Sequence, residues 1–240
     1  MHRLTIYLLA LGVFFTATAE IVVSGILPMI ARDLGISIAL AGQLITAYSL
    51  AFAIGTPIVV ALTARLERRL VLVSALIAFM LGSAVAVSGT DITILMVSRV
   101  ILGVSAGVYL VVALGVVAKL VSAERIGGSI GTIILGFSAA MILGVPMGIA
   151  IASWLNWQAI FIVLGVLSLF VTLALYRLLP QLDGEAPIPW QQQVKVLGST
   201  VIVSGLLLTF FRESGNSVFF TYVAPFMTDM LQMDIRRALA

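Results

Sequence analysis

GQLITAYSLAFAIGTP, residues 42–57, and GTIILGFSAAMILGVP, residues 131–146, are two versions of one segment. Three landmarks recur at a constant offset of 89 residues: Gly42 and Gly131, Gly55 and Gly144, and Pro57 and Pro146. An aromatic residue followed by serine keeps the same register, as Tyr48-Ser49 and as Phe137-Ser138. Glycine, proline and alanine are frequent in membrane helices, but a shared register over 16 positions favours an internal repeat over coincidence.

The composition around this repeat is that of a membrane protein. Hydrophobic residues make up 62% of the 240 residues and charged residues 10%, against roughly 25% charged residues in soluble domains. Runs of about 20 apolar residues are long enough to cross a bilayer as helices. The sequence predicts an all-α integral membrane protein with seven such runs, at residues 5–30, 41–63, 70–88, 92–117, 127–152, 159–178 and 196–226. Arg212-Glu213 interrupts the last of them.

The repeat predicts how these helices are arranged. An offset of 89 residues contains three predicted spans, and an odd number of crossings inverts the second copy in the membrane. Inverted three-helix repeats are typical of secondary transporters. We therefore expect residues 1–179 to form a six-helix transporter bundle (3+3 inverted repeat) and residues 180–195 a polar cytoplasmic linker. Residues 196–240 should begin a second bundle, truncated after the seventh helix.

The basic residues predict the orientation of the chain. Eight of them fall on one side of the predicted spans, namely Arg3, Arg65, Arg68, Arg69, Lys119, Arg125, Arg177 and Lys195. The connections on the other side carry Arg32 before residue 200. Lys and Arg accumulate in cytoplasmic loops, so the N-terminus should be cytoplasmic. Residues 1–20 also have the pattern of a cleavable signal peptide, but the apolar run continues to Ile30, and we expect it to stay in the membrane.

Several function classes are disfavoured by what the sequence lacks. The chain has no Cys and one His, His2, so neither a thiolate nor a histidine-based metal site is expected. The same counts argue against a catalytic triad, and no phosphate-cradling loop is present; we expect no enzyme and no cofactor. A net charge of +3 without a basic cluster is too small for nucleic-acid binding.

Glu20 is an acid within an apolar run, FFTATAEIVVSGILP, residues 14–28. A charge at the bilayer centre costs roughly 2.5–3.5 kcal/mol on insertion scales, and a carboxyl avoids most of that cost by taking up a proton. A side chain that alternates between the two forms can carry protons. Thr16 and Ser24 share its helix face and are candidate hydrogen-bond partners. The alternative is a permanently protonated, structural glutamate.

The repeat offset pairs Glu20 with Tyr109 in the fourth span. We expect both side chains to face one central cavity from opposite sides. Gln43, Tyr48 and Phe137 are further candidates for a substrate cavity, chosen for their aromatic or polar character near the repeated segments.

Two further motifs have both a functional and a structural interpretation. Arg99 cannot lose its proton, so within a span it must pair, contact carbonyls or extend to the membrane surface; Gly103 and Gly107 follow on the same face. The fifth span carries Gly136, Gly144, Pro146 and Gly148. This pattern favours either a hinge or seal, or tight helix packing.

These motifs together resemble the major facilitator superfamily. The arginine-bearing loop after span two, the Arg-x-x-x-Gly of span four and the Gly-x-Pro-x-Gly of span five are similar to its drug:proton antiporter branch. Within that branch, AEIVVSGILPMIARDLGISIALAGQLI and VPMGIAIASWLNWQAIF look most like bacterial purine base or ribonucleoside efflux pumps and arabinose-type efflux permeases. The resemblance implies proton-coupled efflux of a small solute, such as a purine, nucleoside, sugar or drug, across a bacterial plasma membrane.

The resemblance also assigns roles to residues. Arg65, Arg68 and Arg69 match the basic positions of the family's loop motif, whose aspartate is Ala64 here and whose second glycine is Glu67. That change leaves the family's gate salt bridge without its aspartate. Two groups of residues match the remaining motifs: Arg99 and Gly103 the proton-coupling motif, and Gly136, Gly144, Pro146 and Gly148 the antiporter motif. Trp157-Gln158 stands where the family usually has Trp-Arg.

The family has two six-helix halves with the substrate between them, whereas this chain supplies one half, a linker and one further span. We expect a truncated product that needs either a homodimer or a separate C-terminal half to transport. An inactive or regulatory half-transporter is the alternative. A seven-span ligand sensor is less favoured, because residues 180–195, the longest cytoplasmic segment, are too few for an effector domain.

Overall fold

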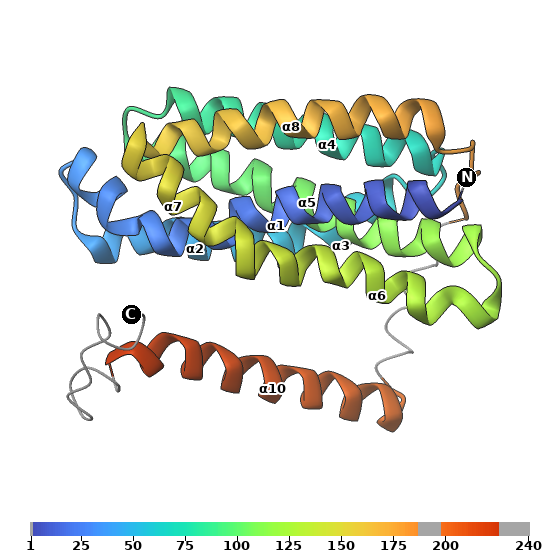
Figure 1. Cartoon of the computed structure of the whole chain (residues 1–240). Coiled ribbons are helices and arrows are strands. Elements are labelled where there is room, and N and C mark those ends of the chain that lie inside the picture. Colours follow the sequence, from blue (N-terminus) through green and yellow to red (C-terminus); the bar gives the residue numbers. More distant parts are fainter. Residues whose placement is uncertain (1, 187–197, 226–240) are drawn as a thin grey trace, which may run out of the picture. The chain divides into compact units, whose positions relative to one another are not determined.

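The computed structural model describes residues 2–186 and 198–225, and every element in them is helical (Figure 1). The chain divides into two units, Met1–Pro187 and Ile188–Ala240. The first unit contains the helices α1 (His2–Asp33), α2 (Ile38–Leu50), α3 (Thr56–Leu62), α4 (Arg68–Ser88), α5 (Ile92–Leu120), α6 (Ala123–Ala139), α7 (Val145–Trp154) and α8 (Trp157–Leu178). Two π-helical segments complete it, η1 (Ala51–Gly55) between α2 and α3, and η2 (Ala140–Gly144) between α6 and α7.

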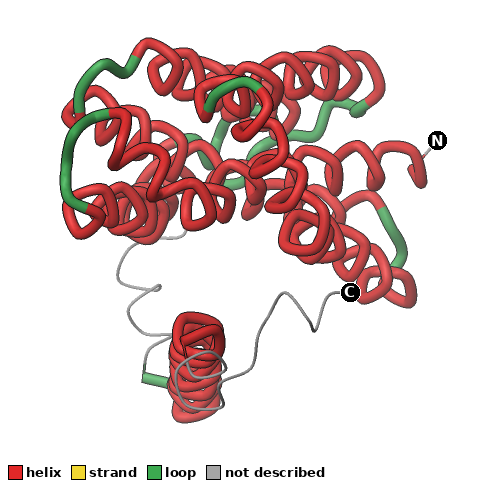
Figure 2. Tube along the Cα trace, turned by 60° about the vertical axis from the view of Figure 1, so that its left-hand side comes forward, coloured by secondary structure: helices red, strands yellow, loops and turns green. Residues whose placement is uncertain are grey.

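Six of these segments are long and apolar enough to cross a membrane: α1, α2–α3, α4, α5, α6–α7 and α8. They coincide with the first six predicted spans and confirm an all-α, multi-pass membrane protein. Figure 2 shows the helices of this unit packed along one another and joined by short loops. Polar residues in the loops cap the first turns of the helices that follow. The carboxylate of Asp91 accepts a hydrogen bond of 2.7 Å from the backbone N–H of Thr93, at the start of α5. The side-chain oxygen of Asn156 accepts one of 2.8 Å from the backbone N–H of Ala159, at the start of α8.

The repeat seen in the sequence is present in the backbone. The segments η1 and η2 begin at Ala51 and Ala140 and stand at the offset of 89 residues, each just before the repeated proline. Proline lacks an N–H and its ring clashes with the carbonyl four residues earlier, so a local π turn accommodates it within a continuous span. In Figure 1 the path from α2 to α3 runs opposite to the path from α6 to α7, which confirms the inverted arrangement.

The core lies between α1 and α5. Both helices contribute side chains that are fully shielded, such as Leu9 and Ile26 from α1 and Leu102 and Tyr109 from α5. Glycine permits the closest approaches. A Cβ on Gly103 would overlap the backbone at Tyr48, and one on Gly136 would overlap the backbone carbonyl of Ala10. The second span therefore packs directly on α5, and the fifth directly on α1.

The second unit contains helix α10 (Thr200–Pro225), within the predicted seventh span. It is not among the six segments that meet the length and hydropathy required for crossing. Arg212 and Glu213, whose side chains are exposed and form an ion pair with each other, lower its hydropathy. A seventh crossing stays a prediction. The division into units falls within the predicted linker, and residues 187–197 and 226–240 lie outside the described part of the chain.

Candidate functional site

Arg99 lies inside the bundle, on α5. Its side chain is 2% exposed, and its Nη1 donates a hydrogen bond of 3.1 Å to the backbone carbonyl of Ala19 on α1. Its guanidinium carbon lies 4.8 Å from the centre of the Phe161 ring on α8, a cation–π contact. The side chain is thus held by α1 and α8 and does not extend to a membrane surface. Its Nε has no hydrogen-bond partner among the described residues.

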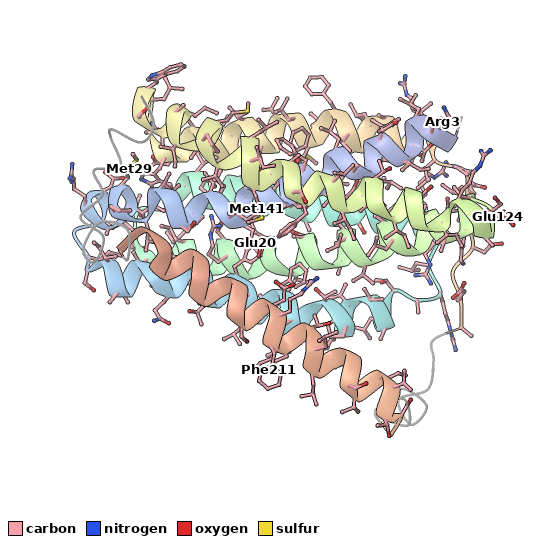
Figure 3. The ribbon with its side chains drawn as sticks, turned by 60° about the horizontal axis from the view of Figure 1, so that its bottom comes forward. Arg3, Glu20, Met29, Glu124, Met141 and Phe211 are labelled. Atoms are coloured by element: carbon pink, nitrogen blue, oxygen red, sulfur yellow. The ribbon has the colours of Figure 1, made fainter. Side chains whose placement is uncertain are left out.

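Glu20 follows Ala19 on α1 and lies away from both ends of the bundle (Figure 3). Its carboxyl lies close to the hydroxyl of Tyr48 on α2, which has no other hydrogen-bond partner among the described residues. The Tyr48 side chain is 2% exposed and also lies within electrostatic reach of Arg99. Three helices therefore bring an acid, a phenol and a permanent cation together. Among the described ion pairs none joins Arg99 to a carboxylate.

The hydroxyls predicted as partners of Glu20 are used elsewhere. Thr16 donates to the backbone carbonyls of Gly12 and Val13, both at 3.1 Å, and Ser24 donates to that of Ile21 at 2.7 Å. Such bonds to the preceding turn are usual for hydroxyls within helices. The group that meets the acid is Tyr48, which the sequence suggested for the cavity without linking it to Glu20.

This arrangement can support a change in protonation. A phenol can donate to an ionised carboxylate and accept from a protonated one, so Tyr48 can serve Glu20 in both forms. Arg99 cannot lose its proton and supplies a fixed charge. Glu20 is the member of the cluster whose charge can vary.

Tyr109 makes a second connection between α5 and α1. Its side chain is fully buried, and its hydroxyl donates to the backbone carbonyl of Leu9 at 3.3 Å. The hydroxyl lies directly over Gly12, where a Cβ would overlap it. Arg99 and Tyr109 thus both donate from α5 to carbonyls of α1. The structure places Tyr109 within the packed bundle, and its contact with a substrate cavity stays a prediction.

The other candidates for the cavity have different surroundings. Gln43 is exposed on α2, and Phe137 is partly buried on α6. The glycines of the fifth span face α1: a Cβ on Gly136, Gly144 or Gly148 would overlap Ala10, Thr18 or Val22, respectively. Tight helix packing is therefore present. Because Gly144 also ends the π turn before Pro146, a hinge stays a prediction.

The loop motif lies at the end of the bundle where α8 ends. Arg65 is exposed, whereas Arg69 pairs with Glu67 at 3.1 Å and lies over the ring of Tyr176, 5.2 Å from its centre. Glu67, which replaces the second glycine of the family motif, therefore has a structural role here, because its carboxylate pairs with Arg69. The backbone N–H of Arg68 donates to the carbonyl of Leu182 at 2.9 Å.

The start of the predicted linker packs on this loop. The backbone N–H of Glu185 donates to the carbonyl of Ala64 at 2.9 Å, and its carboxylate pairs with Lys119 at 2.7 Å. The hydrogen bond and charge of Lys119 lower the pKa of Glu185 below its ordinary value. Gly184 lies against the backbone of Arg65, with no room for a Cβ. Sequence reasoning missed Glu185, because its Pro, Gly and Gln-rich surroundings predict a surface linker.

The opposite end of the bundle is joined by a second interaction that the sequence did not predict. The indole N–H of Trp157, at the start of α8, donates to the carboxylate of Asp33 at 2.9 Å. Asp33 is the last residue of α1. An acid at the end of a span is a weak signal, and nothing in the sequence pairs it with a tryptophan 124 positions away.

Comparison with known proteins identifies the family. The sequence profile of the Major Facilitator Superfamily matches residues 9–239. The uncharacterized MFS-type transporter YbcL of Bacillus subtilis (strain 168) is 38% identical over 225 residues, which cover 94% of this chain and 58% of the relative. A chloramphenicol resistance protein of Streptomyces lividans is 30% identical, with 94% and 59% covered. A probable sugar efflux transporter of Helicobacter acinonychis (strain Sheeba) is 27% identical, with 95% and 58% covered.

A solved structure agrees on the fold. The D-xylose-proton symporter superposes with a TM-score of 0.65 at 19% identity, covering 88% of this chain and 55% of that one. At this identity the likeness shows the fold alone. The chain spans about 58% of the length of the curated relatives that it matches. The matching family, the relative from Bacillus subtilis and the solved structure are those of transporters, which confirms the prediction that the chain is not an enzyme.

Proposed function

We propose, because the chain belongs to the major facilitator superfamily, that it forms the N-terminal part of a proton-coupled efflux transporter for a small solute. The observation that carries the proposal is the placement of Glu20 beside the buried hydroxyl of Tyr48, which in turn lies within electrostatic reach of Arg99. Intramembrane acids usually serve a function, because a purely structural carboxyl in lipid is costly.

In this mechanism Glu20 alternates between two forms. When ionised, it can accept a hydrogen bond from Tyr48, whose hydroxyl lies within electrostatic reach of Arg99. When protonated, it loses its charge, and the contact between α1 and α2 through Tyr48 is weakened. A proton taken up from outside thus favours one arrangement of these helices, and its release to the cytoplasm favours the other. The outward movement of a solute is coupled to that difference.

The class of solute is inferred from the relatives. Their names include a chloramphenicol resistance protein and a probable sugar efflux transporter, so an uncharged or weakly polar small molecule is the favoured substrate. The basic end of the bundle, which carries Arg3, Arg68 and Lys119, supports a cytoplasmic N-terminus in a bacterial plasma membrane. Gln43, Tyr48, Tyr109 and Phe137 are the proposed substrate contacts.

Infrared difference spectroscopy of the purified protein in nanodiscs tests the central step. We expect a protonated-carboxyl band that appears on acidification and is absent from Glu20→Gln. Glu124→Gln, which alters an exposed carboxyl on α6, should retain the band. Circular dichroism confirms that both variants are folded. An unchanged band in folded Glu20→Gln would remove Glu20 as the proton carrier.

A transport assay tests the coupling to solute. Proteoliposomes with an imposed pH gradient should accumulate or release a sugar or chloramphenicol when they contain a full-length counterpart of this chain, and Glu20→Gln should abolish the dependence on the gradient. Gradient-driven transport that is identical in the two proteins would refute proton coupling through this residue.

A further inference from the structure

A pocket lies where α1 and α6 diverge. The two helices touch at Gly136, which packs on the backbone of Ala10. Toward the first residues of both helices they enclose a cavity of about 470 Å³, with Arg3 and Tyr7 on one wall and Arg125 on the other. Figure 3 shows Arg3 and Glu124 at the same end of the bundle.

Two guanidinium groups of this pocket are not neutralised within the described structure. Neither the Arg3 nor the Arg125 side chain forms an ion pair with a described carboxylate. The acid at the rim, Glu124, is exposed in the first turn of α6 and forms no ion pair with either arginine among the described residues. The pocket therefore presents two forked cationic donors, a geometry suited to phosphate.

The floor of the pocket is open and polar. A Cβ on Gly128 would meet no atom within 4 Å, so backbone and not a side chain forms this wall. Ser129, on the same face, supplies a hydroxyl. The Thr132 hydroxyl donates to the Gly128 carbonyl at 3.0 Å, so Ser129 is the hydroxyl donor offered to an anion. A compact anion can reach this floor between the two arginines.

The surroundings favour a lipid as the source of the anion. Tyr7 is 63% exposed and stands beside Arg3, as aromatic residues do at the level of lipid headgroups. Further into the membrane, exposed apolar side chains continue both walls, Leu11 on α1 and Leu135 on α6. A headgroup in the pocket would leave an acyl chain against them. We propose that the α1–α6 pocket binds the phosphate of an anionic phospholipid.

Native mass spectrometry of the detergent-purified protein tests the site with phosphatidylglycerol and, as the zwitterionic comparison, phosphatidylcholine. We expect phosphatidylglycerol to bind preferentially and Arg3→Gln/Arg125→Gln to weaken it about 30-fold, since each cation near an anionic headgroup contributes roughly a factor of five. Equal binding of the two lipids, or no loss in the double variant, would overturn the proposal.

A pair of glycine variants separates the pocket from general effects. Gly128→Leu fills the cavity without a clash and should abolish the preference for phosphatidylglycerol. Gly131→Leu is the matched control, because a Cβ there also meets no atom within 4 Å but the residue does not line the pocket. The proposal fails if both variants behave alike.

Inorganic phosphate distinguishes the two sources of the anion. It should displace phosphatidylglycerol poorly, because it lacks the acyl chain that contacts Leu11 and Leu135. If it binds as tightly as the lipid and competes fully, the pocket is a site for free phosphate, and the lipid assignment is wrong. None of these measurements depends on transport or on Glu20, so the proposal and the proposed function can fail separately.

Discussion

The contact at Gly103 allows the packing of the candidate site to be measured. Gly103 lies on α5, four residues after Arg99, and faces the turn of α2 that carries Tyr48. In Gly103→Ala the new methyl group would overlap the carbonyl oxygen of Tyr48 and press on the backbone of Phe52. These are backbone atoms and cannot rotate away, so α2 and α5 must separate. We expect Tyr48 to move away from Glu20 as a result.

The magnitude follows from two opposing terms. Overpacking a close contact costs roughly 1–3 kcal/mol, and replacing a helical glycine by alanine returns about 1 kcal/mol through helix propensity. The net destabilisation should be about 1 kcal/mol. Gly115→Ala measures the helix-propensity term alone: Gly115 lies on the same helix, and its Cβ would meet no atom within 4 Å. It should be neutral or stabilised by up to about 1 kcal/mol.

Equilibrium unfolding in mixed micelles with increasing SDS, followed by circular dichroism, gives both free energies. The difference between the variants cancels the propensity term and should equal the overpacking cost of roughly 1–3 kcal/mol. If the two variants have the same stability, then α2 and α5 do not pack as closely as the structure has them.

Three other contacts give independent predictions. Tyr109→Phe removes one hydrogen bond between helices and should lower the free energy of unfolding by about 0.6 kcal/mol, and by no more than about 1.7 kcal/mol; a larger loss in SDS unfolding would contradict this role. The lowered pKa of Glu185 means that its pairing with Lys119 stabilises the folded state above the ordinary glutamate pKa of roughly 4.3 and is lost as the pH falls through the lowered value. Glu185→Gln should therefore flatten the acid limb of stability, and an unaltered limb would exclude the ion pair as its cause. Trp157→Phe keeps an aromatic ring, though a smaller one, and removes the donor to Asp33; a loss of at least about 1 kcal/mol is expected in the same assay, and Trp154→Phe, at an exposed position, should show none.

The fold could be predicted because its signals are local. Hydropathy is a property of each segment, and the offset between Pro57 and Pro146 is visible without knowledge of any contact. The same prolines coincide with the irregular points of the two spans, since a π turn lies just before each of them. The inversion then follows from counting crossings.

The site could be predicted only in part, because its contacts join different helices. Glu20 and Arg99 were recognisable as charges within apolar runs, but their neighbours depend on how each helix is rotated. Helical spacing pointed to Thr16 and Ser24, whose hydroxyls bind their own backbone. The neighbour of Glu20 is Tyr48, from another span. No pattern along the chain pairs these two residues.

The packing of residues 182–185 on the loop after α3 could not be predicted either, because it also depends on contacts between distant parts of the chain. Its main contacts are made by backbone groups, from Glu185 to Ala64 and from Arg68 to Leu182. Backbone hydrogen bonds do not require particular side chains, so the sequence does not indicate them. Lys119 and Glu185 are opposite charges, but sequence separation hides their proximity.

The two halves of the repeat share a backbone but not a charge pattern. Glu20 and Tyr109 occupy equivalent positions, as do Ala10 and Arg99, each pair separated by 89 residues. Duplicating the acid and the cation would double the cost of charges in the membrane, roughly 2.5–3.5 kcal/mol for each on insertion scales. With one copy of each, Tyr109 and Arg99 both bind carbonyls of α1, and Glu20 is left as the group with a variable charge. Both donors therefore belong to the second copy of the repeat, whereas their counterparts in the first copy are Ala10 and Glu20, and this difference leaves one proton-accepting position in the cluster.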